Sequence, residues 1–273
     1  NRAAASATGA WILSLDEDEA PEGISRATLG KTLAVEGADA FLVTLEIVAS
    51  CGEVTDVFQQ RQARLFRNLA SLRFERSSLP CVAGTAERHG HNVRVADLTL
   101  RRERAQPCCG SFGTDIELLR QEAAGHPGDA ACLALLGREL YAAGEYQEAA
   151  DVVRAAAEAA GPAHALSPYL AGLRAMALRE AGLAASAIEE CDRALESGLS
   201  CPEIHFARGW ALMALRRPAE AAESFCVAAH ARTRPVPWLM REPTIRDYRA
   251  MMGAALALLE CGAYNERWAN IHM

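Results

Sequence analysis

Lysine is almost missing from this 273-residue sequence, since Lys31 is the only one and nearly every other basic residue is an arginine. A GC-rich coding bias would produce this together with the abundance of alanine, so arginine clusters alone carry little functional meaning. The chain also lacks excess positive charge, because 28 Lys and Arg against 35 Asp and Glu give a net charge of −7. Without a positive field to hold a polyanion, we do not expect a nucleic-acid partner.

Other absences bear on location and on metal binding. No apolar run approaches the length of a membrane-spanning helix, and the N-terminus lacks the layout of a signal peptide, so the cytosol is the expected compartment. The nine cysteines include no CxxC pair, which argues against a zinc site or a disulfide framework. His89 and His91 have ligand-type side chains, but Gly90 and polar neighbours favour a turn there.

The first part of the chain has the pattern of an α/β domain. The length suits about two domains at roughly 150 residues each, and hydrophobic residues make up 51% of the chain. Short apolar runs predict strands, and apolar residues at helical spacing predict one helix between them. The expected strands cover residues 11–15, 41–48, 63–67 and 93–100, and the expected helix covers 24–35. We therefore place a first domain at residues 1–106.

After Pro107 the strand-like runs disappear and alanine-rich helical pairs continue to the C-terminus. Ala187 recurs 38 residues after Ala149, and Ala221 recurs 34 residues later again. This period is typical of tetratricopeptide (TPR) repeats, which are about 34 residues long. Residues 107–273 are therefore predicted to form an all-α superhelix of about four repeats, the last one incomplete, with a concave face; an unrelated helical bundle is the alternative.

Small residues occur where the two helices of a repeat should cross. Gly137 and Ala149 occupy these positions in one repeat, and Gly209 and Ala221 occupy them in another. Only Gly or Ala lets two helix backbones approach closely, so we expect larger side chains to be excluded there.

An acidic cluster directly follows the first apolar run. Alternate side chains at the end of a strand project to the same side, so Asp16 and Asp18 can converge on one cation. Carboxylates in this arrangement hold a hard divalent ion such as Mg²⁺ or Mn²⁺. The alternative is a solvated acidic turn that caps the helix beginning near Pro21.

Two segments of the first domain resemble bacterial family-two glycosyltransferases. Residues 9–19 read Gly-Ala-Trp-Ile-Leu-Ser-Leu-Asp-Glu-Asp-Glu and are similar to a Gly-x-Trp-Ile-Leu-x-Leu-Asp-x-Asp-Glu strand of that family. Residues 64–67, Arg-Leu-Phe-Arg, are similar to a later strand. Family members often carry TPR repeats directly after the catalytic domain. The resemblance implies a partial GT-A, Rossmann-like sheet, and it implies a fragment that lacks the N-terminal half of the transferase domain.

The same resemblance implies an enzyme and a set of site residues. Asp16 and Asp18 match the metal-binding Asp-x-Asp element, while Glu19 and Arg64 would join them in binding the nucleotide-sugar donor. The reaction would be a metal-assisted, inverting transfer of the sugar to an acceptor. The concave face of the repeats would bind the acceptor or a protein partner.

One departure from the family pattern concerns the general base. Similar proteins have a His-Glu pair after the Arg-Leu-Phe-Arg strand, and its expected position falls at Leu79-Pro80. Neither residue can take the acceptor proton, and only spacing would recommend Glu75 or Glu87. The catalytic base is therefore unassigned. An inactive TPR scaffold that binds proteins, with a degenerate transferase half, is the alternative function.

Overall fold

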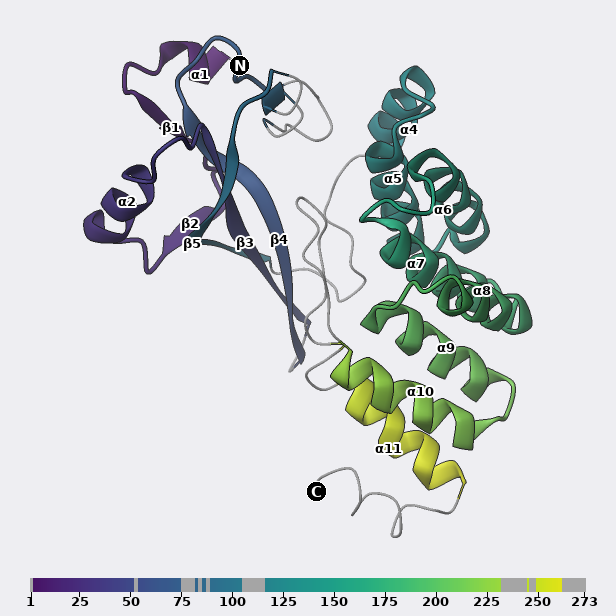
Figure 1. Cartoon of the computed structure of the whole chain (residues 1–273). Coiled ribbons are helices and arrows are strands. Elements are labelled where there is room, and N and C mark those ends of the chain that lie inside the picture. Colours follow the sequence, from purple (N-terminus) through teal and green to yellow (C-terminus); the bar gives the residue numbers. More distant parts are fainter. Residues whose placement is uncertain are drawn as a thin grey trace. The chain divides into compact units, whose positions relative to one another are not determined.

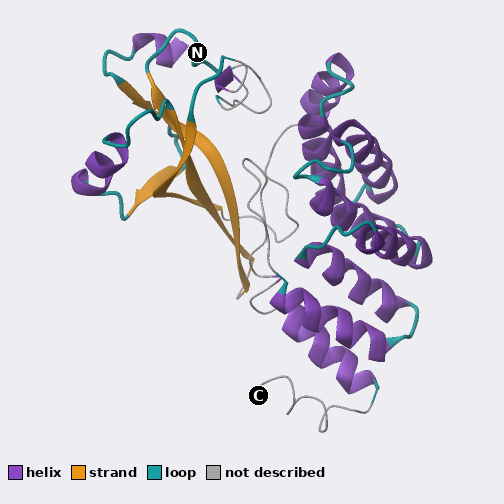
Figure 2. Cartoon of the chain, viewed as in Figure 1, coloured by secondary structure: helices purple, strands orange, loops and turns teal. Residues whose placement is uncertain are grey.

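A computed structural model describes residues 2–51, 54–74, 82, 85–86, 89–104, 116–231, 245 and 249–261. The chain divides into two units, the first built mainly from residues 1–108 and the second mainly from the residues that follow. Figure 1 labels the elements of each unit, and Figure 2 shows that the strands belong to the first unit. Each unit is described by itself.

The first unit is built on a five-stranded sheet of order β1-β4-β3-β5-β2. β3 pairs with β4 in antiparallel and with β5 in parallel orientation, while β1 and β2 pair antiparallel to β4 and β5 at the two edges. Among the described residues, helices α1 and α2 accompany the sheet, and a reciprocal Ser25–Thr28 capping box begins α2. The bounds are α1 Arg2–Ser6, β1 Trp11–Leu13, β2 Glu19–Glu22, α2 Arg26–Leu33, β3 Ala40–Cys51, β4 Val54–Arg67 and β5 Val93–Arg104.

This topology corrects the predicted sheet. The expected strands at 41–48, 63–67 and 93–100 lie within β3, β4 and β5, but the run from Trp11 forms only a three-residue edge strand. Glu19–Glu22, expected to be part of an acidic turn and a chain break, forms the opposite edge strand. Three of the four strand pairings are antiparallel, whereas a Rossmann-like sheet consists mainly of parallel strands joined by crossover helices. The expected Rossmann-like, GT-A sheet is therefore wrong for the described residues.

An apolar core fills one end of the sheet. There the start of β3, the end of β4 and the turn that follows β4 pack together, and Phe66 and Leu72 are fully buried. Val82 and Ala86 complete this core, and Phe74 packs against it. β3 and β5 are parallel and begin at this end of the sheet, and antiparallel β4 ends there. The core therefore fixes the segments that precede β3 and β5 and the segment that follows β4.

The second unit consists of antiparallel helical pairs. α5 pairs with α6, α7 with α8 and α9 with α10, and the first helices α5, α7, α9 and α11 also contact one another in succession. The predicted helical repeats are confirmed for this unit. The bounds are α4 Ile116–Gly125, α5 Ala130–Ala142, α6 Tyr146–Ala160, α7 Ser167–Glu180, α8 Ala184–Glu196, α9 Pro202–Ala214, α10 Pro218–His230 and α11 Ala250–Glu260. Within the described ranges, no helix combines the length and apolar character needed to cross a bilayer.

Glycines let the helices of the repeats approach closely, as the sequence predicts. A Cβ atom added at Gly137 would collide with the Val153 side chain of α6. At Gly209 it would lie only 2.7 Å from the ring of Phe225, and a Cβ added at Gly253 of α11 would lie 2.8 Å from the same ring. Real Cβ atoms need a separation of roughly 3.5 Å or more from carbon, so these crossings admit no side chain without rearrangement.

Candidate functional site

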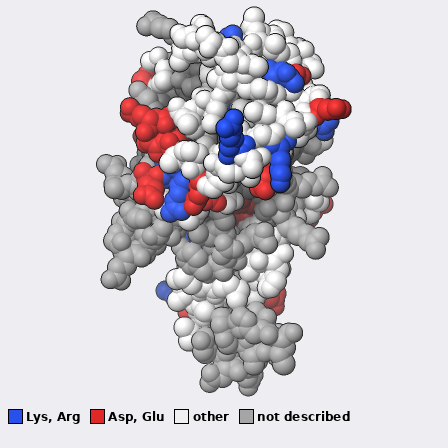
Figure 3. All heavy atoms as spheres, turned by 90° about the vertical axis from the view of Figure 1, so that its left-hand side faces the viewer, with Lys and Arg blue, Asp and Glu red and all other residues white. Residues whose placement is uncertain are grey.

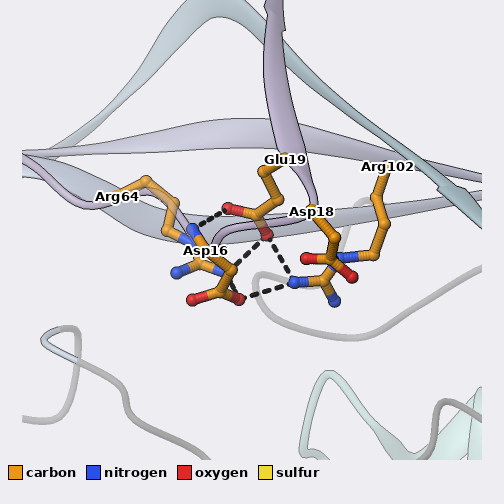
Figure 4. A network of polar contacts seen from close by, with 5 residues as sticks. All are labelled: Asp16, Asp18, Glu19, Arg64 and Arg102. Atoms are coloured by element: carbon orange, nitrogen blue, oxygen red, sulfur yellow. Dashed lines mark hydrogen bonds and ion pairs between the residues drawn. The ribbon is translucent and has the colours of Figure 1, made fainter.

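The acidic cluster closes the turn between β1 and β2. The backbone N–H of Asp16 donates to Glu19 Oε2 over 2.9 Å, and the N–H of Glu19 donates back to the Asp16 carbonyl over 3.1 Å. These two bonds fold the carboxylates of the turn toward one place (Figure 4). The local sequence therefore builds the turn, but it does not supply the counterions.

Two arginines from distant strands provide the counterions (Figure 4). Arg64 of β4 donates through Nη2 to Asp16 Oδ2 over 3.0 Å and to Glu19 Oε1 over 2.8 Å. Arg102 of β5 donates through Nη2 to the same two oxygens, over 2.6 and 3.0 Å, and its Nε lies 2.9 Å from Asp18 Oδ1. The cluster thus joins the β1–β2 turn to strands on both sides of β3.

Burial and charge shift the pKa values of two carboxyl groups in opposite directions. Burial raises the pKa of Glu19 above its usual range, and the nearby Asp16 carboxylate adds to the effect, although Arg64 and Arg102 oppose it. For Asp16 burial acts in the same direction, but hydrogen bonds and charge attraction from the two arginines outweigh it and lower the pKa. The Glu19 side chain has no exposed surface, so its charge depends on these arginines.

The structure brings together all four residues predicted for this site, namely Asp16, Asp18, Glu19 and Arg64, and it adds Arg102. Guanidinium groups already neutralise the carboxylates, so Mg²⁺ or Mn²⁺ at Asp16 and Asp18 would have to compete with them; metal binding stays a prediction. Among the described residues, no group of three or more His, Cys, Asp or Glu is arranged to hold a metal ion. No local signal identified Arg102, which is 86 residues from Asp16.

A second candidate site lies on the first helices of the repeats. Trp210 of α9 packs against Phe225 at 5.3 Å between ring centroids and against Phe206 at 6.3 Å. Arg179 of α7 lies over the Trp210 ring, with its guanidinium carbon 5.9 Å from the ring centroid. Since a cation over an indole face is attractive, the contact links two successive repeats.

The interactions of Arg179 extend to a third first helix, α5. Arg179 also pairs with the neighbouring Glu180. Burial is the main cause that raises the pKa of Tyr141 of α5, with Glu180 adding to it, while Arg179 opposes the shift. Tyr141 also contacts Tyr146 at 5.6 Å between ring centroids. We call Tyr141, Arg179, Glu180 and Trp210 the first-helix row; it offers aromatic and charged groups from three successive first helices.

Charges elsewhere are mixed in sign. Figure 3 shows acidic and basic side chains interspersed on the face it draws, without a continuous basic patch among the described residues of that face. That nucleic acid is not a partner stays a prediction.

The chain resembles solved structures of other proteins over part of its length. No family model matches the sequence, and no curated protein matches it. Solved structures that resemble the chain include two of MamA, each 15% identical, with TM-scores of 0.42 and 0.44; they cover 57% and 59% of this chain and 76% and 85% of those chains. Another is TTC0263, described as a thermophilic TPR protein in Thermus thermophilus, with 19% identity, a TM-score of 0.41, and coverage of 54% and 73%.

The fold of the first unit corrects the identification suggested by the sequence motifs. Its described sheet is mostly antiparallel, unlike the Rossmann-like sheet that this identification requires. The identification of the chain as part of a family-two, GT-A glycosyltransferase with a DXD motif is therefore wrong. No other observation supports a nucleotide-sugar donor. The position expected to carry the catalytic base, Leu79-Pro80, lies outside the described residues, as do Glu75 and Glu87.

Proposed function

We propose that the helical unit is a protein-interaction scaffold that binds a peptide segment of a partner protein on the first-helix row. The observation that carries the proposal is the contact of Arg179 with Trp210 across two repeats. The charges of Arg179 and Glu180 also act on Tyr141 in a third repeat. Repeat arrays bind partners through extended surfaces formed by equivalent helices, and this row has that form.

The chemistry of the row suits binding. Tryptophan, tyrosine and arginine dominate the residues that contribute most to protein interfaces. Trp210 is held by Phe206 and Phe225, so ordering it on binding costs little conformational entropy. Arg179 keeps part of its surface exposed and offers donors to a partner's carboxylates or carbonyl groups.

Selection from a peptide library tests this function. Peptides selected on the immobilised chain are synthesised with a fluorophore, and their affinities are measured by fluorescence polarisation for the parent, Trp210→Ala and Arg154→Ala. We expect Trp210→Ala to weaken binding by about 30-fold or more, since anchors of this kind contribute at least about 2 kcal/mol.

Arg154→Ala is the control for a large side chain that is lost from the repeats away from the first-helix row. Arg154 lies on second helix α6 and pairs with Glu158 on its own helix. We expect this variant to bind the peptides like the parent. Equal affinity of Trp210→Ala and parent for every selected peptide would contradict the proposal, and so would a selection that yields no binding peptide.

A further inference from the structure

Three residues with acid–base and nucleophilic chemistry meet at the end of the sheet that the apolar core fixes. Asp39 directly precedes β3, and His91 lies two residues before β5. Because β3 and β5 are parallel, both segments lie at the same end of the sheet. Antiparallel β4 finishes there, and Ser71 lies in the turn that follows it. The topology, rather than sequence proximity, therefore assembles the cluster.

The three side chains are arranged as a nucleophile, a base and an orienting acid. Ser71 Oγ lies 2.8 Å from His91 Nε2, which is a normal hydrogen-bond length. On the other side of the ring, His91 Nδ1 lies 3.5 Å from Asp39 Oδ2. This second distance is long for a hydrogen bond, but such contacts are often loose before substrate binds.

Neighbouring groups hold each member in place. The backbone N–H of Asn92 donates to Asp39 Oδ2 over 3.0 Å, and the N–H of Asp39 donates to the Asn92 carbonyl over 2.9 Å. The N–H of His91 donates to the carbonyl of Ala86, which belongs to the apolar core. Leu72, the neighbour of Ser71, is fully buried in that core. Backbone hydrogen bonds and the apolar core therefore support the positions of the three residues, as a catalytic arrangement requires.

The side chains also remain accessible. The His91 side chain is 17% exposed and that of Asp39 is 28% exposed. Ser71 is partly exposed as well. Solvent therefore reaches the cluster, whereas a fully buried polar network would serve stability alone.

From this geometry we propose that Ser71, His91 and Asp39 form a serine nucleophile site that transfers the acyl group of small carboxylic esters. Ser71 Oγ attacks the carbonyl carbon and forms a C–O bond while its proton passes to His91 Nε2. The ester C–O bond then breaks, and the alcohol leaves with that proton. Water attacks the acyl-serine in the same way, which releases the carboxylic acid and restores the Ser71 hydroxyl. Asp39 orients the ring and stabilises the imidazolium.

A fluorophosphonate probe tests the site on the full chain. Its reaction forms an Oγ–P bond and breaks the P–F bond, and fluoride and the hydroxyl proton leave. We expect mass spectrometry to place the adduct on Ser71 and to find no adduct there in Ser71→Ala. His91→Gln should slow labelling of Ser71 by about 100-fold, the usual contribution of a general base. Hydrolysis of p-nitrophenyl acetate should fall in parallel.

Ser200→Ala is the matched control, because Ser200 Oγ also lies against a histidine, 3.1 Å from His205 Nε2. Burial lowers the pKa of His205, and the charged group beside it is Arg208, a cation that cannot play the role of Asp39. We expect Ser200→Ala to be labelled like the parent.

Circular dichroism melts confirm that each variant is folded. Asp39→Asn keeps an acceptor for the Asn92 N–H and should slow labelling of Ser71 without unfolding the chain. Absence of a Ser71 adduct in the folded parent would overturn the proposal. Labelling of Ser71 at the parental rate in folded His91→Gln would overturn it too.

Discussion

Replacing Gly209 by alanine tests the close helix crossing by the sign of the stability change. An added Cβ would lie 2.7, 2.8 and 2.9 Å from three atoms of the Phe225 ring. The ring would have to retreat by about 1 Å to restore ordinary contact. It cannot do so freely, because it is fully buried and Gly253 of α11 approaches it equally closely.

Two effects of opposite sign determine the magnitude. Overpacking a well-filled core costs about 1–3 kcal/mol. Alanine instead of glycine inside a helix contributes about 1 kcal/mol of stability. We therefore expect Gly209→Ala to lower the free energy of unfolding by about 1 kcal/mol, measured by urea denaturation followed by far-ultraviolet circular dichroism.

Two variants separate the clash from helix propensity. Gly125 of α4 has open space around its Cβ position, so Gly125→Ala should not destabilise the chain. In a Phe225→Leu background the ring is gone, and Gly209→Ala should then become stabilising. If Gly209→Ala stabilises the parent chain as Gly125→Ala does, the close-crossing argument is refuted.

The carboxylate–arginine cluster leads to three further predictions. Asp16→Asn should lower the free energy of unfolding at pH 7 by only about 1 kcal/mol, because solvent weakens the ion pairs of a half-exposed carboxylate. Since folding lowers the pKa of Asp16, the difference from the parent should disappear as the pH falls below the ordinary value of 3.8. Arg64→Ala should lower the free energy of unfolding by about 3–5 kcal/mol, measured by urea denaturation, because it deprives buried Glu19 of a counterion. Arg101→Ala is the control, since it removes an exposed pair with Glu22 and should lower this free energy by less than about 1 kcal/mol. If Asp16 and Asp18 bind Mn²⁺, millimolar Mn²⁺ should raise the melting temperature and Asp18→Asn should abolish the rise; an unchanged melting temperature in the parent chain would contradict metal binding.

The repeats could be predicted because their information is local. Small residues such as Gly137 and Ala149 recur with the helix pairs, and each pair contacts only its neighbours along the chain. The apolar runs also located β3, β4 and β5, since strand formation depends on nearby residue types. Pairing order was not accessible in this way, so the sequence did not indicate that the strand from Trp11 lies at an edge of the sheet.

The candidate sites show the same limit. The sequence grouped Asp16 with Asp18 because they are close together in the chain, but Arg102 reaches them only through strand pairing. Ser71 and His91 meet for the same reason, 20 residues apart. The resemblance that assigned a catalytic role to the acidic turn rested on short motifs, and short motifs do not determine how strands pair.

Hydrogen–deuterium exchange of the full chain, with and without a selected peptide, tests the central claim most directly. It reports which backbone amides a bound partner protects. We expect peptide-dependent protection in α5, α7 and α9, centred on the turns that carry Tyr141, Arg179 and Trp210. Protection confined to the second helices α6, α8 and α10, or to the sheet of the first unit, would contradict binding on the first-helix row.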